Sequence, residues 1–198
     1  AFNNAFKNMQ HIKTVSIDTS GATDTTYMFS GSVIENPPYL NTSNVTDVTS
    51  MFYNCPNLKY IPPYDFSNVS IMYGVFWGCS NITSIPYLDT HNVTDASYCF
   101  AECTKLKSVP LLDFSNVTNA RLAFYGCTSL TDVGGCTGLK VDIDFHYSPL
   151  THASALNVID NLAVSSGHTV QFKRTTFKTL TPAEIAKATD KGWTIKGV

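Results

Sequence analysis

The chain carries cysteines at a fixed spacing, and cysteine is the residue type here with the widest choice of chemistry. Four of its six cysteines follow one 24-residue period, each at the third position after a phenylalanine: Phe52 and Cys55, Phe76 and Cys79, Phe100 and Cys103, Phe124 and Cys127. Thiols can pair as disulfides or, as thiolates, bind zinc. A linear series does not converge on one point as a tetrahedral zinc site requires, so the spacing disfavours zinc.

The remaining two cysteines follow the same period. Cys99 lies one period after Val75, and Cys136 lies one period after Leu112. All six cysteines therefore occupy apolar positions of a repeat, where cysteine serves as a small buried hydrophobe. We expect free, buried thiols. Disulfides between cysteines of neighbouring repeats are the alternative, because distance alone does not exclude them.

Carboxylates and imidazoles supply no catalytic pattern. Asp65, Asp89 and Asp113 form a series, but they are related by the same period, which favours a turn or capping role over acid–base chemistry. The histidines share no spacing typical of metal ligands; they are His11, His91, His146, His152 and His168. No Ser/His/Asp arrangement or glycine-rich phosphate loop is present in the sequence. We therefore expect neither an enzyme nor a bound cofactor or metal.

The composition excludes two further classes of partner. The formal net charge of the 198 residues is −2, which gives no electrostatic case for binding nucleic acid. No apolar run approaches the ~18–20 residues that cross a bilayer, so we expect no membrane insertion within this segment. The repeat is already under way at residue 5, and we expect the chain to be a segment of a longer protein.

The repeat can be divided into four successive frames, each one period long: 40–63, 64–87, 88–111 and 112–135. Each frame contains Asn-Val-Thr or Asn-Val-Ser, beginning at Asn44, Asn68, Asn92 and Asn116. Upstream the pattern continues with 23-residue steps, through Phe29 and Phe6, and Ile12 and Val15 match Leu58 and Ile61. A period in this range is the mark of a solenoid, whose repeats stack on their neighbours. The asparagines are expected to form a second ladder, with their amides satisfying backbone groups at a turn.

Each frame is expected to hold one short helix and one short strand. Val48, Met51, Phe52 and Cys55 have the i, i+3, i+4, i+7 spacing of one helix face, and Thr46 can cap its N-terminus, as can Ser70, Thr94 and Thr118. Residues 58–61, Leu-x-x-Ile ended by a proline, predict a strand. The fold class is therefore α/β, a solenoid with a parallel sheet on one side and short helices on the other.

The repeat resembles a known family. The segments Leu88-Asp89-Thr90-His91-Asn92-Val93-Thr94 and Met51-Phe52-Tyr53-Asn54-Cys55-Pro56-Asn57-Leu58 look like BspA-like leucine-rich repeats of bacterial surface proteins. The resemblance covers about residues 5–141, with Met9 and Ser32 in place of the cysteine. It implies a right-handed leucine-rich-repeat solenoid, a secreted or cell-surface location, and a binding or adhesion role without catalytic residues.

The register of the repeat fades near residue 142, so we divide the chain into a repeat array (1–141) and a C-terminal capping segment (142–198). Thr151 can cap a helix through Ala163, with an inner face of Ala155, Leu156, Ile159 and Leu162. A strand containing Val170 and Phe172 follows. Thr181-Pro182-Ala183-Glu184 is a capping box that opens a helix, Gly192 ends it, and residues 193–195 predict a last strand. The segment is expected to cover the end of the stack as an α/β cap.

Exposed aromatic residues are the candidates for function. On the expected helix Tyr53, Trp77 and Tyr125 lie opposite the apolar face, joined by Tyr27 and Tyr98, while Tyr60, Tyr64 and Tyr87 lie near the strand side. An outward aromatic stripe can bind a protein or a carbohydrate, although packing between coils is an alternative reason for it. We expect an extracellular or cell-surface bacterial binding module, or else a spacer within a larger surface or phage-associated protein. The first coil has no visible cap, so Phe6, Met9 and Ile12 are expected to be partly exposed.

Overall fold

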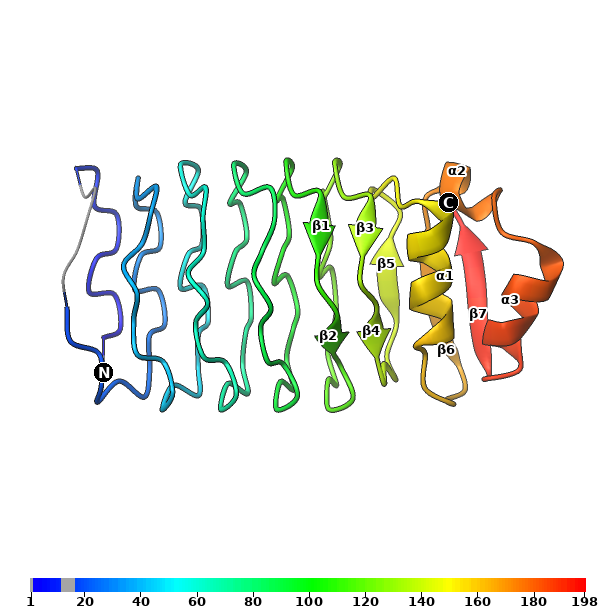
Figure 1. Cartoon of the computed structure of the whole chain (residues 1–198), viewed down its shortest axis with the longest axis horizontal. Coiled ribbons are helices and arrows are strands. Elements are labelled where there is room, and N and C mark those ends of the chain that lie inside the picture. The colour runs from blue at the N-terminus through cyan, green and yellow to red at the C-terminus, as the bar shows by residue number, and fades with distance from the viewer. Residues whose placement is uncertain (1, 12–16) are drawn as a thin grey trace.

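The computed structural model describes residues 2–11 and 17–198, which form an elongated stack of coils (Figure 1). Ile12 and Val15, on which the placement of the first repeat partly depended, lie outside the described residues. Parallel bridges join equivalent residues of successive coils: Asp24 with Asp47, Asp47 with Ile71, Ile71 with Asp95, and Asp95 with Asn119. Each coil therefore pairs with the coil one repeat away.

The short helices predicted in the repeat are wrong. Residues 48–55 form consecutive turns, in which Met51 N–H donates to the Val48 carbonyl at 3.0 Å and Tyr53 N–H to the Ser50 carbonyl at 3.0 Å. Ser50 and Asn54 each have φ of 52°, which no α-helix contains. We call this segment and its equivalents 72–79, 96–103 and 120–127 the turn runs. The i, i+3, i+4, i+7 spacing did not distinguish a helix from this structure, because two four-residue turns in succession also bring these positions to one side.

The turn runs are held together by hydrogen bonds between coils. The N–H groups of alternate residues donate to the next coil: Val48 to the Ile71 carbonyl (3.0 Å), Ser50 to Tyr73 (2.8 Å), Phe52 to Val75 (2.9 Å) and Asn54 to Trp77 (2.7 Å). A helix would have used these donors internally. Because the donors point along the stack, each turn run is one rung of a continuous hydrogen-bonded ladder.

The N-caps predicted at Thr46 and its equivalents are wrong for the same reason. The Ser70, Thr94 and Thr118 hydroxyls donate to the carbonyl of the equivalent residue one coil earlier, at 3.1–3.2 Å. Thr46 makes the same contact with the Thr23 carbonyl at 3.5 Å. These hydroxyls therefore reinforce the stack and cap no helix.

Regular strands occur only in the later part of the described chain, and all pair in parallel. β1 (Ser108–Val109) pairs with β3 (Asp132–Val133), where strands are predicted. β2 (Leu112–Asp113) pairs with β4 (Cys136–Thr137), a pairing that the sequence did not indicate. The predicted strands at 58–61 and 82–85 are not formed, although Ser84 makes a single parallel bridge to Ser108.

The C-terminal segment adds a three-stranded parallel sheet and the helices of the described chain. Its elements are β5 (Ile143–Phe145), α1 (His152–Asp160), β6 (His168–Phe172), α2 (Arg174–Phe177), α3 (Pro182–Thr189) and β7 (Trp193–Gly197). β6 lies between β5 and β7, and the helices gather at this end of the stack (Figure 1).

Both predicted helix starts in this segment are present. The Thr151 hydroxyl accepts from Ser154 N–H, and Thr181 and Glu184 form the capping box of α3. α1 ends at Asp160, before the predicted Ala163. Its inner face uses Val158 in place of Leu156, which is only partly buried. The short helix α2 was not predicted.

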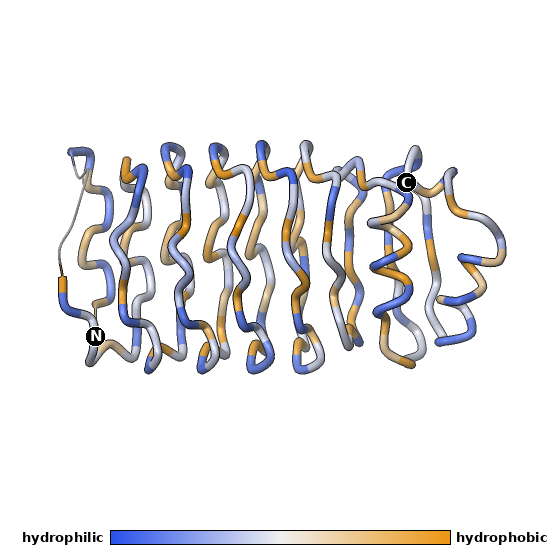
Figure 2. The backbone as a smooth tube through the Cα atoms, viewed as in Figure 1, coloured by the Kyte–Doolittle hydropathy of each residue, from blue (hydrophilic) through white to orange (hydrophobic). Residues whose placement is uncertain are grey.

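A column of phenylalanine rings runs through the core along the stack. Neighbouring ring centroids lie 4.9–6.1 Å apart in the series Phe6, Phe29, Phe52, Phe76, Phe100, Phe124, Phe145 and Phe172. The column crosses the boundary drawn at residues 141/142, so the C-terminal segment packs as its continuation. Hydrophobic and hydrophilic residues alternate along each coil, as this burial requires (Figure 2). At the first coil Phe6 is partly buried and Met9 is 45% exposed.

Candidate binding surface

The outward positions of the turn runs carry a group of touching aromatic rings. Trp77 stacks on Tyr98 with centroids 4.7 Å apart, and Tyr53 meets Trp77 edge-on at 5.3 Å. Tyr73 lies 5.6 Å from Tyr98. We call these four residues, which come from three successive coils, the aromatic stripe. Tyr53 is 37% exposed and the other three are partly buried.

Tyr98 joins the stripe from a strained backbone position. Its φ is 55°, in the left-handed region that is costly for a bulky side chain, by roughly 1–2 kcal/mol. The equivalent residue one coil earlier is Gly74, and the position that holds Trp77 in that coil is Ala101 in the coil of Tyr98. The Tyr98 ring therefore supplies the aromatic surface that Ala101 lacks. Sequence reasoning placed Tyr98 in the stripe but could not detect the strain.

Tyr125 is not part of this group. Its ring lies 4.9 Å from Tyr147, which in turn lies 3.8 Å from the His146 imidazole. Tyr27, at the other end, lies under the Lys7 ammonium at 4.8 Å from the ring centroid. The predicted stripe is thus divided into separate aromatic contacts along the stack.

The candidates near the strand side have different surroundings. Tyr60 is 54% exposed and Tyr87 is 67% exposed. Tyr64 is 3% exposed, its hydroxyl donates to the Pro38 carbonyl at 2.9 Å, and burial raises its pKa. Tyr64 is therefore a core residue, and its prediction as a ligand contact is wrong. Sequence reasoning missed Tyr39, which is 68% exposed and lies two repeats before Tyr87.

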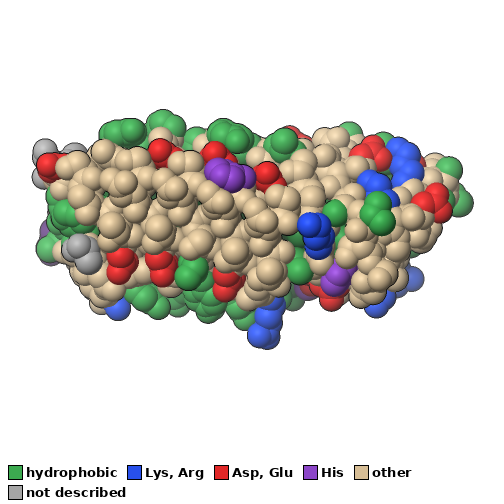
Figure 3. All heavy atoms as spheres, turned by 90° about the horizontal axis from the view of Figure 1, so that it is seen from below, with side chains coloured by type: hydrophobic (Ala, Val, Ile, Leu, Met, Phe, Trp, Pro, Cys, Tyr) green, Lys and Arg blue, Asp and Glu red, His purple; other side chains and the backbone are tan. Residues whose placement is uncertain are grey.

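Figure 3 places these features on the surface. In this view hydrophobic side chains form rows along both long edges of the repeat array, whereas the face between them is mainly polar with scattered carboxylates. Such rows follow from the repeat, because an outward position in one coil lies beside its equivalents in the next. Any ligand that contacts several coils would meet side chains of one position in series.

The cysteines form a ladder of thiol hydrogen bonds inside the stack. All six are buried and free. The thiols of the periodic cysteines donate to the carbonyl of the phenylalanine one coil earlier: Cys55 to Phe29 (3.0 Å), Cys79 to Phe52 (3.0 Å), Cys103 to Phe76 (3.1 Å) and Cys127 to Phe100 (3.1 Å). Burial raises the thiol pKa values, that of Cys55 to about 11 and that of Cys136 to about 12. These thiols are poor nucleophiles near neutral pH.

The asparagine ladder predicted from the sequence is present. The side-chain amides of Asn68, Asn92 and Asn116 donate to a backbone carbonyl of the preceding coil at 2.7 Å, and Asn44 does so at 3.3 Å. The Asp series has the predicted turn role. Asp65 accepts from the hydroxyl and N–H of Ser67, which lowers its pKa, and Asp113 accepts from Ser115 N–H. These polar side chains are engaged in holding the coil.

Four of the five histidines lie beside a carboxylate, and His168 does so at 3.7 Å from Asp142. His91 contacts Asp89 at 2.7 Å, His146 contacts Asp144 at 2.7 Å, and His152 contacts Glu184 at 3.0 Å. Among residues 2–11 and 17–198 no three His, Cys, Asp or Glu side chains gather as a metal site would need.

Comparison with known proteins gives one family. A family model described as "Mycoplasma protein of unknown function, DUF285" matches residues 1–81 and 23–133, together about two thirds of the chain. No curated protein and no solved structure matches.

Proposed function

The chain belongs to the DUF285 family, and we propose that it is a recognition module that binds a glycan or a protein through the aromatic stripe. The observation that carries this proposal is Tyr98. Its ring is held against Trp77, 4.7 Å away, from a backbone position with φ of 55°. The left-handed φ itself belongs to the turn run, since Tyr27, Ser50 and Leu122 have φ of 52–53° at the equivalent position. What distinguishes Tyr98 is its ring stacked on Trp77.

The chemistry of the stripe suits recognition. Aromatic rings bury a large apolar area at little cost in conformational entropy, and Tyr and Trp add a polar group that can hydrogen-bond a ligand. The ladder beneath the stripe fixes the spacing of the coils, so the rings are presented on a rigid support. The inward phenylalanine is the same in each coil, whereas the residue after it is Tyr53, Trp77, Ala101 or Tyr125 in successive coils. Variation on a constant frame favours a surface adapted to one ligand.

The likeness to BspA-like leucine-rich repeats supports the same proposal and adds a location, outside the cell or on its surface. The proposed fold class remains that of a leucine-rich-repeat solenoid, with turn runs in place of helices. Within the described ranges no helix is both long and apolar enough to cross a membrane.

A structural spacer is the second candidate. The stripe rings contact one another, so they also stabilise the stack, and the phenylalanine column runs from Phe6 to Phe172. A spacer would need only this continuity.

Binding of the purified chain to a glycan array and to an array of extracellular proteins tests the proposal. We expect a ligand whose affinity falls at least about tenfold in Trp77→Ala and in Tyr98→Ala, with circular dichroism unchanged. Tyr87→Ala is the matched control, since it removes a more exposed ring from another part of the surface. Loss of affinity in Tyr87→Ala alone would place the binding site on the strand side. If the purified chain bound nothing on either array, the spacer function would be favoured.

A further inference from the structure

The strand side of the array carries a row of exposed apolar side chains at one position of the repeat. The row consists of Tyr39, Pro63, Tyr87 and Leu111, each 24 residues after the one before. The next residue along the chain is buried in every coil: Leu40, Tyr64, Leu88 and Leu112. Because successive side chains of an extended segment point to opposite faces, the four exposed residues share the outward face. We call them the apolar row.

Hydrogen bonds on both sides of the apolar row hold its coils in register. On one side Lys59 N–H donates to the Glu35 carbonyl at 3.1 Å. On the other side the asparagine ladder joins the same coils, with distances of 2.7 Å. Neighbouring chains in a parallel ladder lie about 4.8 Å apart. Tyr39 and Tyr87, which are two coils apart, are therefore separated by about 10 Å.

Large and smaller side chains alternate along the apolar row. Tyr39 and Tyr87 are 68% and 67% exposed, Pro63 lies in the coil between them, and Leu111 in the next coil is 44% exposed. The shape of the row thus repeats every two coils, or about 10 Å. A polyproline II helix has three residues per turn and repeats after about 9 Å. An α-helix repeats after about 5.4 Å, which does not match this alternation.

A row of carboxylates runs beside the apolar row. Asp65, Asp89 and Asp113 lie two residues further along the chain, on the same outward face and about 7 Å away. Each accepts from a backbone N–H two residues later and keeps its charge. Among the described residues no Lys or Arg pairs with them, and only His91 contacts Asp89. Figure 3 shows carboxylates next to a hydrophobic edge of the array. This surface therefore favours a cationic partner.

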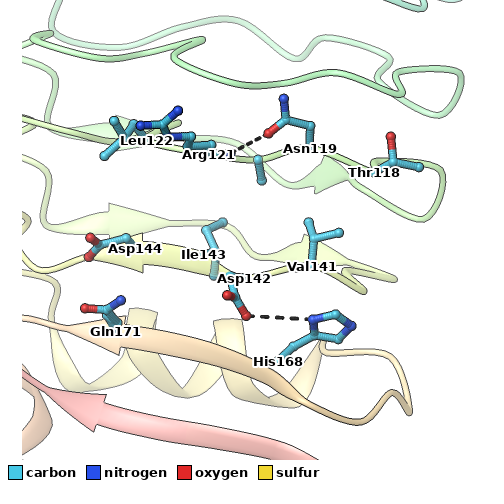
Figure 4. A pocket seen from close by; sticks show the side chains of 11 residues that line it. Thr118, Asn119, Arg121, Leu122, Val141, Asp142, Ile143, Asp144, His168 and Gln171 are labelled. Carbon is cyan, nitrogen blue, oxygen red and sulfur yellow. Dashed lines mark hydrogen bonds and ion pairs between the residues drawn. The ribbon is translucent and has the colours of Figure 1, made fainter.

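The pocket beside the last turn run and β5 has no such uniform charge. It has a volume of about 520 Å³ (Figure 4). Arg121 lines one wall, and Asp142 and Asp144 line the other. Its walls thus carry both signs of charge, whereas the carboxylate row carries one sign over three coils.

We propose that the apolar row and the carboxylates beside it bind a proline-rich peptide segment in the polyproline II conformation that carries Lys or Arg. Two prolines three residues apart lie over Pro63 and Leu111, on either side of the Tyr87 ring, and the cation faces the carboxylates. Exposed aromatic rings bind such segments because polyproline II is formed in advance and loses little entropy. A stable protein–protein interface takes about 20–30 residues a side, so a row of this size fits a short segment.

Peptides of defined sequence test the proposal by fluorescence anisotropy with the purified chain. The probe is an end-capped, dye-labelled peptide of repeated Pro-Pro-Lys. Its matched controls are repeated Gly-Ser-Lys, which keeps the charge without the conformation, and repeated Pro-Pro-Glu, which keeps the conformation and reverses the charge. The probe should bind at least about tenfold more tightly than either control. No binding of the probe, or equal binding of Gly-Ser-Lys, would overturn the proposal.

Aromatic variants locate the site. Tyr39→Ala and Tyr87→Ala should each weaken the probe about tenfold. Trp77→Ala should leave its affinity unchanged, because Trp77 belongs to the aromatic stripe and this inference is independent of that stripe. Unchanged affinity in both tyrosine variants would refute the proposal, and so would an oligosaccharide that requires Tyr39 and Tyr87 when the probe does not bind.

A charge variant tests the carboxylates. Asp113→Asn keeps the acceptor for Ser115 N–H but removes the charge, and it should weaken the probe about threefold. Asp95→Asn is the matched control, since Asp95 makes the same kind of contact with Ser97 N–H within a turn run. It should leave the affinity unchanged. Equal effects of the two variants would show that the peptide is attracted by overall charge and would count against this site.

Discussion

Replacing Phe76 by alanine tests whether the phenylalanine column holds the stack together. Phe76 is fully buried between Phe52 and Phe100, with both ring centroids 5.8 Å away. Truncating a buried phenylalanine costs about 3–5 kcal/mol, and more where the surroundings cannot collapse into the cavity. Here the backbones on both sides are fixed by the ladder, since Phe52 N–H donates to Val75 and Phe76 N–H to Cys99. We therefore expect a loss of about 4–5 kcal/mol in the free energy of unfolding.

Phe6→Ala is the matched control. Phe6 is only partly buried and stacks on one ring, Phe29, at 5.3 Å. Its loss should cost about 1–2 kcal/mol, less than half the cost at Phe76. Urea unfolding followed by circular dichroism and by tryptophan fluorescence measures both. Because a stack is stabilised by contacts between neighbours, Phe76→Ala should also broaden the transition or split it in two. A cost at Phe76 below about 1.5 kcal/mol, or equal to that at Phe6, would refute a core built on this column.

Four further predictions concern the thiols and the turn runs. In urea unfolding, Cys79→Ser should lower the free energy of unfolding by no more than Cys79→Ala does. A hydroxyl can replace the thiol as donor to the Phe52 carbonyl, whereas alanine leaves that carbonyl without its donor. A larger loss for serine than for alanine would count against the thiol hydrogen bond. Free-thiol titration should find close to six groups in denaturant and almost none in the native chain at pH 8, and two or more missing in denaturant would indicate disulfides. Burial raises the pKa of the Cys55 thiol from 9.0 to about 11 and that of Cys136 to about 12, so the unfolded chain loses these protons at lower pH than the folded chain. The contribution of the thiols to the free energy of unfolding should therefore be complete below pH 9 and fall as pH rises toward 11–12. Urea midpoints measured across this range would detect the fall. Ser50→Gly should raise stability by about 0.5–1 kcal/mol in thermal unfolding, because φ of 52° is costly for serine and free for glycine, and a drop in melting temperature would contradict that strain.

The register of the stack could be predicted from the sequence because it depends on spacing alone. The regular spacing of the cysteines and phenylalanines predicted which residues lie at equivalent positions in successive coils. The parallel bridges join residues that are 23 or 24 positions apart, as that spacing requires. The same signal failed at Phe145 and Phe172, whose steps along the chain differ from the period. Their place in the column is set by the packing of β5 and β6, which no spacing in the sequence records.

Local conformation was harder to predict, and the turn runs explain why. Apolar spacing alone cannot distinguish a helix from two successive turns. The distinguishing signal is the residue type at the left-handed positions, such as Gly74 and Gly78, which have φ of 55° and 77°. The N-caps Thr151 and Thr181 were predicted correctly because a capping hydrogen bond joins residues that are only a few positions apart in the sequence. Tyr64 was misassigned because its hydroxyl finds an acceptor in another coil, at Pro38.

The open donors of the last turn run follow from how two kinds of structure are joined. A turn run sends alternate N–H groups to the next coil, so each run needs a partner of the same shape. The C-terminal sheet has regular strands, and β5 already pairs with β6. The last turn run therefore meets a partner that differs in shape, and among the described residues the N–H groups of Ala120, Leu122, Phe124 and Gly126 have no acceptor. Closing this gap would require another turn run in place of β5, which would only move the mismatch one coil further along. Open donors are thus a consequence of ending this ladder with a regular sheet, and they lie where residues 120–127 meet β5.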